Sequence, residues 1–199
     1  MGIISAAGTV ATNHPLSPLF RACQGHTAPA QLSCQQYAGS VPTTGRSTGI
    51  ASYYLNDKFK LGREIKTDKF QIINFKHEVL DLINVYRSQS GNSVDLLENI
   101  KKQIEQGRIT IITGDFNICF MENSSNTMVK GLLRMGFDQL VHEPTHIRGR
   151  HIDHIYFMDP TKRLKPIIER YSPYYSDHDA MCITIPGLIH HKEATTSTN

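Results

Sequence analysis

Short apolar runs separated by turn residues make up most of the chain from about residue 49 onward. Two segments carry apolar residues at helical spacing. One begins at residue 93 and ends at Gly107, and the other covers residues 126–135 and is followed by Gly136. Because helices are interspersed among strands, the pattern favours a layered α/β or α+β domain over an all-β barrel. The runs with the length and composition of strands are residues 50–55, 70–75, 79–86, 109–113, 151–157, 167–171 and 180–185.

Residues 1–45 lack such a pattern. They contain no Asp or Glu, four prolines and a single basic residue, Arg21, and they show neither a helical nor a strand period. This composition predicts a poorly ordered lead-in over residues 1–45. The same reasoning predicts a folded domain over residues 46–186 and a polar tail over residues 187–199.

Composition excludes several classes of protein. The formal net charge of +3 is too small to indicate a nucleic-acid binder by itself. The four cysteines form no C-x-x-C pair, which argues against a zinc site or a disulfide framework. No basic secretory start and no apolar run of about 20 residues is found. We therefore expect an intracellular protein, nuclear or cytoplasmic, that is neither secreted nor associated with a membrane.

Candidate chemistry begins at residues 114–117 (GDFN), which directly follow the strand predicted at 109–113. Ligand and metal sites of α/β sheets commonly lie at the carboxyl ends of strands. Two further polar motifs follow, HIDHI at residues 151–155 and SDH at 176–178. Cleavage of a phosphodiester requires an activated water, a cation and donors to the phosphate oxygens. The three motifs together indicate metal-assisted cleavage of a phosphate ester.

The residue types fit that chemistry. Asp115 and Asp177 offer hard oxygen ligands for Mg²⁺ or Mn²⁺. Asn117 can donate to a phosphate oxygen or accept from water, and Asp153 can pair with His178 and raise its basicity.

Each motif also has an ordinary structural interpretation. An Asp-x-Asn sequence after a strand is often only a turn, and SDH can cap a helix or turn. His151 and His154 are more typical of surface or hydrogen-bonded histidines than of ligands, and Arg148 and Arg150 can contact phosphate or simply face solvent. Asp153 is harder to explain structurally, because a carboxylate within an apolar strand is costly unless it is paired.

In this order, the GDFN, IDHI and SDH motifs resemble the endonuclease/exonuclease/phosphatase superfamily. The IDHI and SDHDA forms, with NVYR at residues 84–87, are most similar to endonuclease domains of LINE-type retrotransposons and related transposon proteins. The resemblance covers residues 46–186 and implies a four-layered α/β sandwich that cuts phosphate esters with Mg²⁺. DNA is the implied partner, and RNA or a phosphorylated small molecule are the alternatives.

The resemblance also implies a role for each matching residue. Asp115 would hold or deprotonate the attacking water, and Asn117 would position that water and the phosphate. Asp153 would orient His178 at the scissile phosphate, and Asp177 would join the metal-binding carboxylates. Tyr86 would contact phosphate. Arg87, Arg148 and Arg150 are the further residues that we expect to contact phosphate or nucleic acid.

One departure from the family pattern affects the expected activity. Family domains begin with a strand bearing an Asn, followed by a strand and helix bearing a metal-binding Glu, whereas the first Glu here is Glu64. The sequence therefore predicts a domain whose N-terminal part is missing. Three hypotheses follow: a DNA endonuclease derived from a mobile element, an inactive fragment that at most binds nucleic acid or protein, and a phosphatase or RNA-cleaving member of the superfamily.

Overall fold

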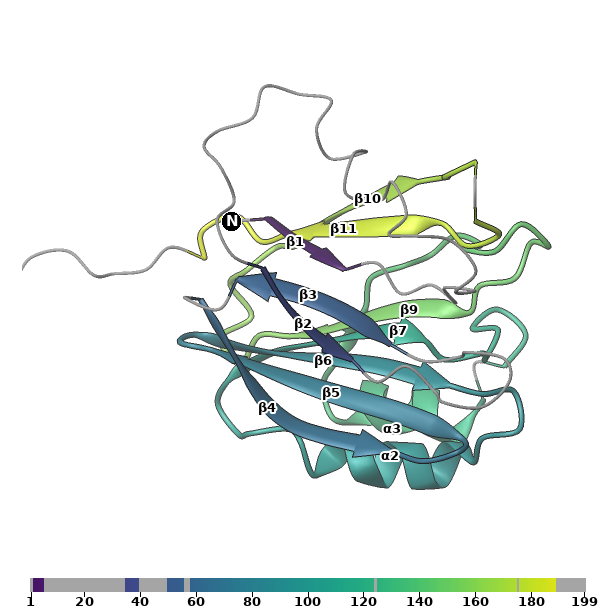
Figure 1. The fold of residues 1–199 in the computed structure, drawn as a ribbon, viewed down its shortest axis with the longest axis horizontal. Helices are drawn as coiled ribbons and strands as arrows, with labels where there is room; N and C mark the ends of the chain where they lie inside the picture. Colours follow the sequence, from purple (N-terminus) through teal and green to yellow (C-terminus); the bar gives the residue numbers. More distant parts are fainter. Residues whose placement is uncertain are drawn as a thin grey trace, which may run out of the picture.

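A six-stranded sheet forms the centre of the molecule (Figure 1). The computed structural model describes residues 2–5, 35–39, 50–55, 58–123, 125–174 and 176–188. Strands β6 and β7 run parallel, with a helix in the connection between them, and all other neighbours are antiparallel. In spatial order the strands are β4 (Phe59–Lys66), β5 (Phe70–His77), β6 (Leu80–Arg87), β7 (Ile109–Asp115), β9 (Asp153–Met158) and β8 (Asp138–Gln139).

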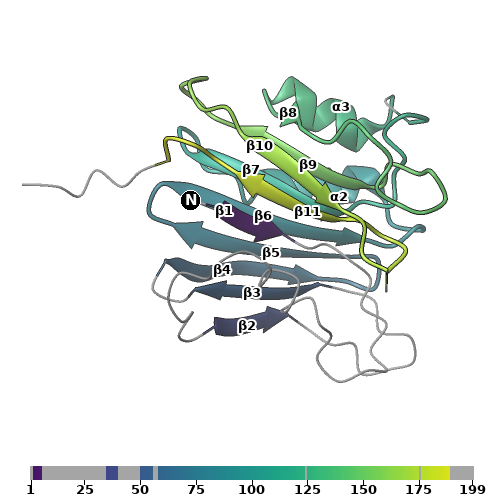
Figure 2. The same ribbon diagram turned by 90° about the horizontal axis from the view of Figure 1, so that it is seen from above.

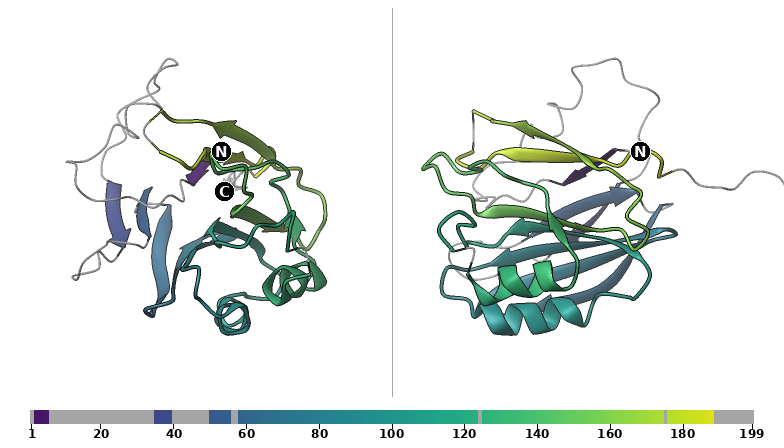
Figure 3. Two further views of the ribbon diagram at one scale, coloured as in Figure 1. Left: turned by 90° about the vertical axis from the view of Figure 1, so that its right-hand side faces the viewer. Right: turned by 180° about the vertical axis from the view of Figure 1, so that it is seen from behind.

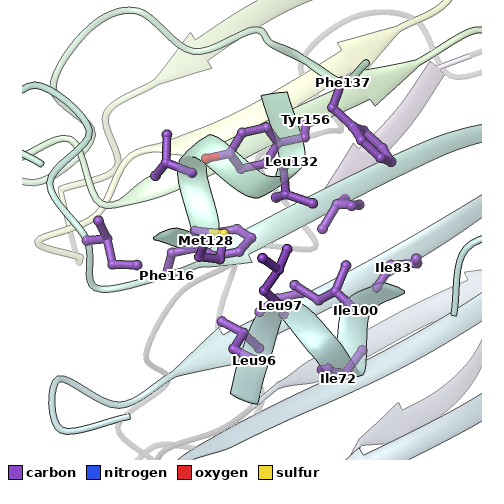
Figure 4. Close-up of a cluster of buried hydrophobic side chains, with 14 of the residues drawn as sticks. Ile72, Ile83, Leu96, Leu97, Ile100, Phe116, Met128, Leu132, Phe137 and Tyr156 are labelled. Atoms are coloured by element: carbon purple, nitrogen blue, oxygen red, sulfur yellow. The ribbon is translucent and has the colours of Figure 1, made fainter. Parts of the chain in front are cut away.

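Two helices, α2 (Ser93–Lys101) and α3 (Thr127–Arg134), cover one face of this sheet (Figure 3). The Asn92 side chain caps α2 by accepting from two backbone N–H groups. The helices can approach closely because a Cβ at Gly131 would lie only 2.3 Å from a methyl carbon of Leu97. Figure 4 shows the resulting core, whose labelled side chains are Ile72, Ile83, Leu96, Leu97, Ile100, Phe116, Met128, Leu132, Phe137 and Tyr156.

A second layer of strands covers the opposite face (Figures 2 and 3). It contains a three-stranded sheet of β1 (Gly2–Ser5), β11 (Ala180–Thr184) and β10 (Ile167–Tyr171), and a pair of β2 (Gln35–Gly39) with β3 (Ala51–Leu55). A second apolar core lies between the layers, because both faces of the central strands are apolar. Its buried members are Phe59, Ile73, Phe75, Leu80, Leu82, Ile111, Val141, Ile155, Phe157, Met181, Ile183 and Ile185.

The layered α/β architecture expected from the sequence is confirmed, and each predicted strand and helix from residue 50 onward is present. Four strands escaped prediction. Strand β4 has only one fully buried position, so it shows no apolar period, and β8 has two residues. Strands β1 and β2 lie within residues 1–45, where no strand was expected because the sequence shows no strand period. They form through pairing with β11 and β3. The domain boundaries themselves stay predictions.

Two sequence expectations concern residues that are only partly described. Cys119 is a buried free thiol, and Cys23 and Cys34 lie outside the described residues. Most of the predicted polar tail, residues 189–199, also lies outside them. Among the described residues, no helix has the length and apolar character needed to cross a membrane.

Candidate active site

The candidate site lies where the ends of three central strands meet. Asp115 is the last residue of β7 and pairs in register with Asp153, the first residue of β9. Tyr86, near the end of β6, is the register partner of Asp115 on its other side and is half-buried. The exposed fractions of Asp115 and Asp153 are only 3% and 0%, so the sheet brings two carboxylates together away from bulk water.

Gly114 permits this close arrangement. Its φ is +148°, and a Cβ there would lie 1.7 Å from the carbonyl oxygen of Val85 on β6. Glycine is therefore required at this position, because any side chain would separate β7 from β6 just before Asp115.

The turn after β7 fixes the Asp115 carboxylate. Asn117 adopts a φ of +50°, donates its backbone N–H to Asp115 Oδ1 at 2.9 Å and its amide Nδ2 to Oδ2 at 3.2 Å. The same amide donates to the carbonyl oxygen of Arg87 at 2.7 Å. Asn117 thus positions Asp115 directly, and its Oδ1 is left to accept from a water or another donor.

Arg87 has a different place from the one expected. Its guanidinium is buried and donates to the backbone carbonyl oxygens of Gly91 at 3.1 Å and Phe116 at 2.9 Å. These bonds engage the donors that a phosphate would need, so the expected phosphate contact by Arg87 is not supported. Arg87 instead fixes the loop that carries Asn117, and its charge lowers the pKa of Asp115 slightly against larger opposing effects.

A chain of hydrogen bonds leads from Thr145 to His178. The Thr145 hydroxyl donates to Asp153 Oδ2 at 2.7 Å, and His178 Nδ1 lies 2.9 Å from the same oxygen. A carboxylate accepts, so Nδ1 carries a proton and the neutral ring presents the lone pair of Nε2. The expected pairing of Asp153 with His178 is therefore present.

Sequence reasoning missed Thr145. Its hydroxyl also accepts the backbone N–H groups of Ile152 and Asp153, and it is fully buried. A single Thr in a loop eight residues before Asp153 has no periodicity or spacing that marks it. Its importance follows from how the loop folds against the start of β9.

Burial and charge shift the acid–base properties of the three groups. Burial, followed by the like charge of Asp153, raises the pKa of Asp115 to about 7. Burial also raises the pKa of Asp153, although its hydrogen bond from His178 opposes this shift. The hydrogen bond to Asp153 raises the pKa of His178. The arrangement brings together a carboxyl that can exchange a proton near neutral pH and an imidazole whose protonated form is favoured.

Asp177 lies apart from this pair of carboxylates. Its side chain is 63% exposed, and its Oδ2 lies 3.3 Å from Nε2 of His146. His146 Nδ1 accepts the backbone N–H of Arg148 at 3.0 Å, so the proton of the neutral ring resides on Nε2 and is donated to Asp177. Arg148 is exposed and Arg150 is half-buried in the same loop.

Within the part of the chain that the structure describes, potential metal ligands fall into two groups. The first group contains Asp115, Asp153 and His178, and the second contains His146, Asp177 and His178. Within each group the ligand atoms lie within 4.8 Å of one another. The pair expected from the sequence, Asp115 with Asp177, is not united in either group. The first group fits a divalent cation, because Asp153 Oδ1 is buried and finds no hydrogen-bond partner among the described residues.

A layer of aromatic and histidine side chains supports the loop after Asp115. His154 stacks on Phe116 with ring centroids 5.0 Å apart, and its Nε2 donates to the carbonyl oxygen of Ile118 at 2.9 Å. The backbone N–H of Phe120 donates to the carbonyl oxygen of His151. His151 and His154 are both fully buried, and His154 is hydrogen-bonded, so this pair belongs to the support of the loop.

An open hollow borders the second group of ligands. Ile147, which is 81% exposed, stands at its rim on the loop that carries His146. Backbone hydrogen bonds from Ile147 N to Asp177 O and from Asp179 N to Thr145 O join the two loops. The lining residues are His146, Ile147, Ser172, Pro173, Ser176, Asp177 and Asp179.

Comparison with known proteins agrees with this fold. The sequence pattern of the Endonuclease/Exonuclease/phosphatase family matches residues 38–178, which is more than half of the chain. The chain therefore belongs to this family. No match was found among curated proteins.

Solved structures of low sequence identity share the fold. The endonuclease domain of TRAS1, a telomere-specific non-LTR retrotransposon, is 15% identical and has a TM-score of 0.57, with 75% of this chain and 77% of that one covered. The cytolethal distending toxin of Haemophilus ducreyi is 12% identical (TM-score 0.56; 92% and 83% covered). Truncated TDP2 of Caenorhabditis elegans is 13% identical (TM-score 0.54; 92% and 82% covered).

Proposed function

We propose that this protein is a divalent-metal-dependent nuclease that cleaves phosphodiester bonds of DNA as an endonuclease. The observation that carries the proposal is the hydrogen-bonded chain from Thr145 through Asp153 to His178, which ends beside the buried carboxylate of Asp115. Membership of the Endonuclease/Exonuclease/phosphatase family supports it. A fold shared with the TRAS1 retrotransposon endonuclease makes DNA the first substrate to test.

Each residue of the site has a distinct role in such a reaction. Asp115, with a pKa of about 7, accepts a proton from the attacking water. Asn117 fixes that carboxylate, and Asp153 holds His178 through Nδ1, which leaves Nε2 on the other side of the ring. In its protonated form, His178 donates from Nε2 to a phosphate oxygen as negative charge develops there. Bound Mg²⁺ or Mn²⁺ would supply charge neutralisation at the phosphate.

Residues at the rim would contact the substrate. The Tyr86 hydroxyl comes from the strand beside Asp115 and could donate to a phosphate oxygen. Arg148 and Arg150, on the loop next to His146, would contact the nucleic-acid backbone.

The direct test is nicking of supercoiled plasmid DNA by the full chain. Nicking should require Mg²⁺ or Mn²⁺, cease with EDTA, and be abolished in Asp115→Ala and in His178→Ala. Nicking that persists in both variants after clean purification would contradict the proposal. Parallel assays with RNA and with phosphorylated small molecules distinguish the two alternative substrates. A chain that turns over none of the three would be the inactive binding module.

A further inference from the structure

We propose that Arg170 is a positioning residue of the candidate site, because its guanidinium joins the loop that carries Thr145 to the loop that carries His178. The inference rests on the proposed function for its effect on cleavage, but its effect on the His178 ring can be measured without any activity. Arg170 lies on β10, in the outer layer of strands, and belongs to none of the GDFN, HIDHI and SDH motifs.

The guanidinium of Arg170 holds the two loops through different nitrogens. Nη1 donates to the carbonyl oxygen of Pro144 at 2.7 Å, so it fixes the peptide group between Pro144 and Thr145. Nε lies 3.5 Å from Oδ2 of Asp179, the residue that directly follows His178. The donors of a planar guanidinium form a rigid fork, so the two partners are fixed relative to each other as well as to β10.

Hydrogen bonds lead from these two partners to the buried chain of the site. The backbone N–H of Asp179 donates to the carbonyl oxygen of Thr145 at 2.8 Å. The Thr145 hydroxyl and His178 Nδ1 in turn lie 2.7 Å and 2.9 Å from the same oxygen of Asp153. Arg170 therefore contacts the residue next to each end of this chain. A shift of either loop would misalign the bond between His178 and Asp153.

The remaining contacts distinguish a positioning role from a stabilising one. Nη2 of Arg170 lies 2.8 Å from Oε2 of Glu143, but Glu143 is 70% exposed, and such an ion pair contributes little to stability. Asp179 also accepts from the Ser172 hydroxyl at 2.7 Å. The loops thus keep other bonds when Arg170 is removed. We expect the protein to stay folded while the orientation of His178 becomes less well defined.

The test measures the tautomer of the His178 ring in the full chain, without metal or nucleic acid, at a pH at which the ring is neutral. Long-range proton–nitrogen NMR correlations report it, and absence of the signal in His178→Gln assigns it. Wild type is compared with Arg170→Gln and Arg170→Lys. Arg163→Gln is the matched control that removes the same charge, because Arg163 is exposed and follows the end of β9 farther from Asp153. Thermal unfolding and the kcat and KM of plasmid nicking are measured for each protein.

We expect wild type and Arg163→Gln to carry the His178 proton on Nδ1 alone. In Arg170→Gln the bond to Asp153 loosens, so a form with the proton on Nε2 should appear. The kcat of nicking should fall about tenfold or more, and KM should change by less than about twofold. Arg170→Lys should restore neither property, since an ammonium is a point charge and cannot fix both loops in one geometry.

An unchanged tautomer in Arg170→Gln, full rescue by Arg170→Lys, or mixed tautomers in the wild type would each overturn the inference. An unchanged kcat in Arg170→Gln, with active wild type, would overturn it as well. If Arg170→Gln does not fold, Arg170→Lys is decisive, because it keeps the charge and carries the same prediction. If no protein nicks DNA, the proposed function fails, and the His178 tautomer still decides the role of Arg170.

Discussion

At the scale of single residues, Thr145 is the side chain on which the geometry of Asp153 most depends. Replacing Thr145 by Val removes the donor to Asp153 Oδ2 and the acceptor for two backbone N–H groups, with little change in volume. We expect nicking to fall about tenfold or more, as for other residues that orient ligands. Unfolding free energy should fall by about 1–3 kcal/mol, since buried donors lose their acceptor.

Thr145→Ser is the matched control, because it keeps the hydroxyl and removes only a methyl group. Plasmid nicking and chemical denaturation of both variants give the comparison. Equal activity in Thr145→Val and Thr145→Ser would show that the hydroxyl does not position Asp153.

Gly114 is the second residue whose effect can be predicted from geometry. A Cβ in Gly114→Ala would collide with the Val85 carbonyl oxygen, so β6 and β7 would have to separate beside the site. We expect a loss of stability of several kcal/mol, about the scale of other backbone clashes in cores, or no folded protein. Gly107→Ala is the control: its φ is also positive, at +78°, but nothing lies within 4 Å. The control should lose only about 1 kcal/mol in thermal unfolding.

At the scale of elements, the buried carboxylate of Asp81 forms two ion pairs that join β5, β6 and the residue before β7 at the end opposite the site. Asp81 is completely buried, and its oxygens lie 2.9 Å from Lys76 Nζ and 3.1 Å from Arg108 Nε. Asp81→Ala should reduce the unfolding free energy by about 1–3 kcal/mol, because Lys76 and Arg108 each lose a charged hydrogen-bond partner. Glu105→Gln, at the exposed end of the same network, should change it by less than about 1 kcal/mol in the same urea titration. Equal losses would show that burial of Asp81 is unimportant.

The same elements show what the sequence can reveal. Strands β5 and β6 are apolar on both faces and were predictable, whereas β4 is solvent-facing at most positions and depends on its pairing with β5. The motifs located Asp115, Asp153 and His178 because ordered sets of polar residues at strand ends are unusual. The pairing of Asp115 with Asp153 could not be predicted, because strand register arises from contacts between segments far apart in the chain. The hydrogen bonds of Thr145 and Arg87 depend on loop conformation, which no periodicity encodes.

At the scale of the whole molecule, the response of stability to acid combines groups of opposite sign. Burial lowers the pKa of His154 to about 3. Below pH 6.5 the unfolded chain therefore binds a proton that the folded chain does not, and stability decreases as the pH is lowered. Asp115 acts in the opposite direction: its pKa is raised to about 7, so between about pH 4 and pH 7 the folded chain holds the extra proton and stability increases as pH falls. A simple pH profile of the wild type would therefore conceal both effects.

Comparison of variants separates the contribution of His154. His154→Gln removes the titrating ring and leaves Asp115 in place, so the stability difference between wild type and variant isolates the histidine. The free energy of unfolding of the wild type minus that of His154→Gln should be about 2 kcal/mol smaller at pH 5 than at pH 7. Each pH unit below the unfolded pKa of about 6.5 corresponds to about 1.4 kcal/mol. Urea denaturation of both proteins at the two pH values measures this difference. If the difference in unfolding free energy between wild type and His154→Gln is the same at both pH values, the folded protein protonates His154 readily. The loop after Asp115 would then not depend on a neutral His154 ring stacked on Phe116.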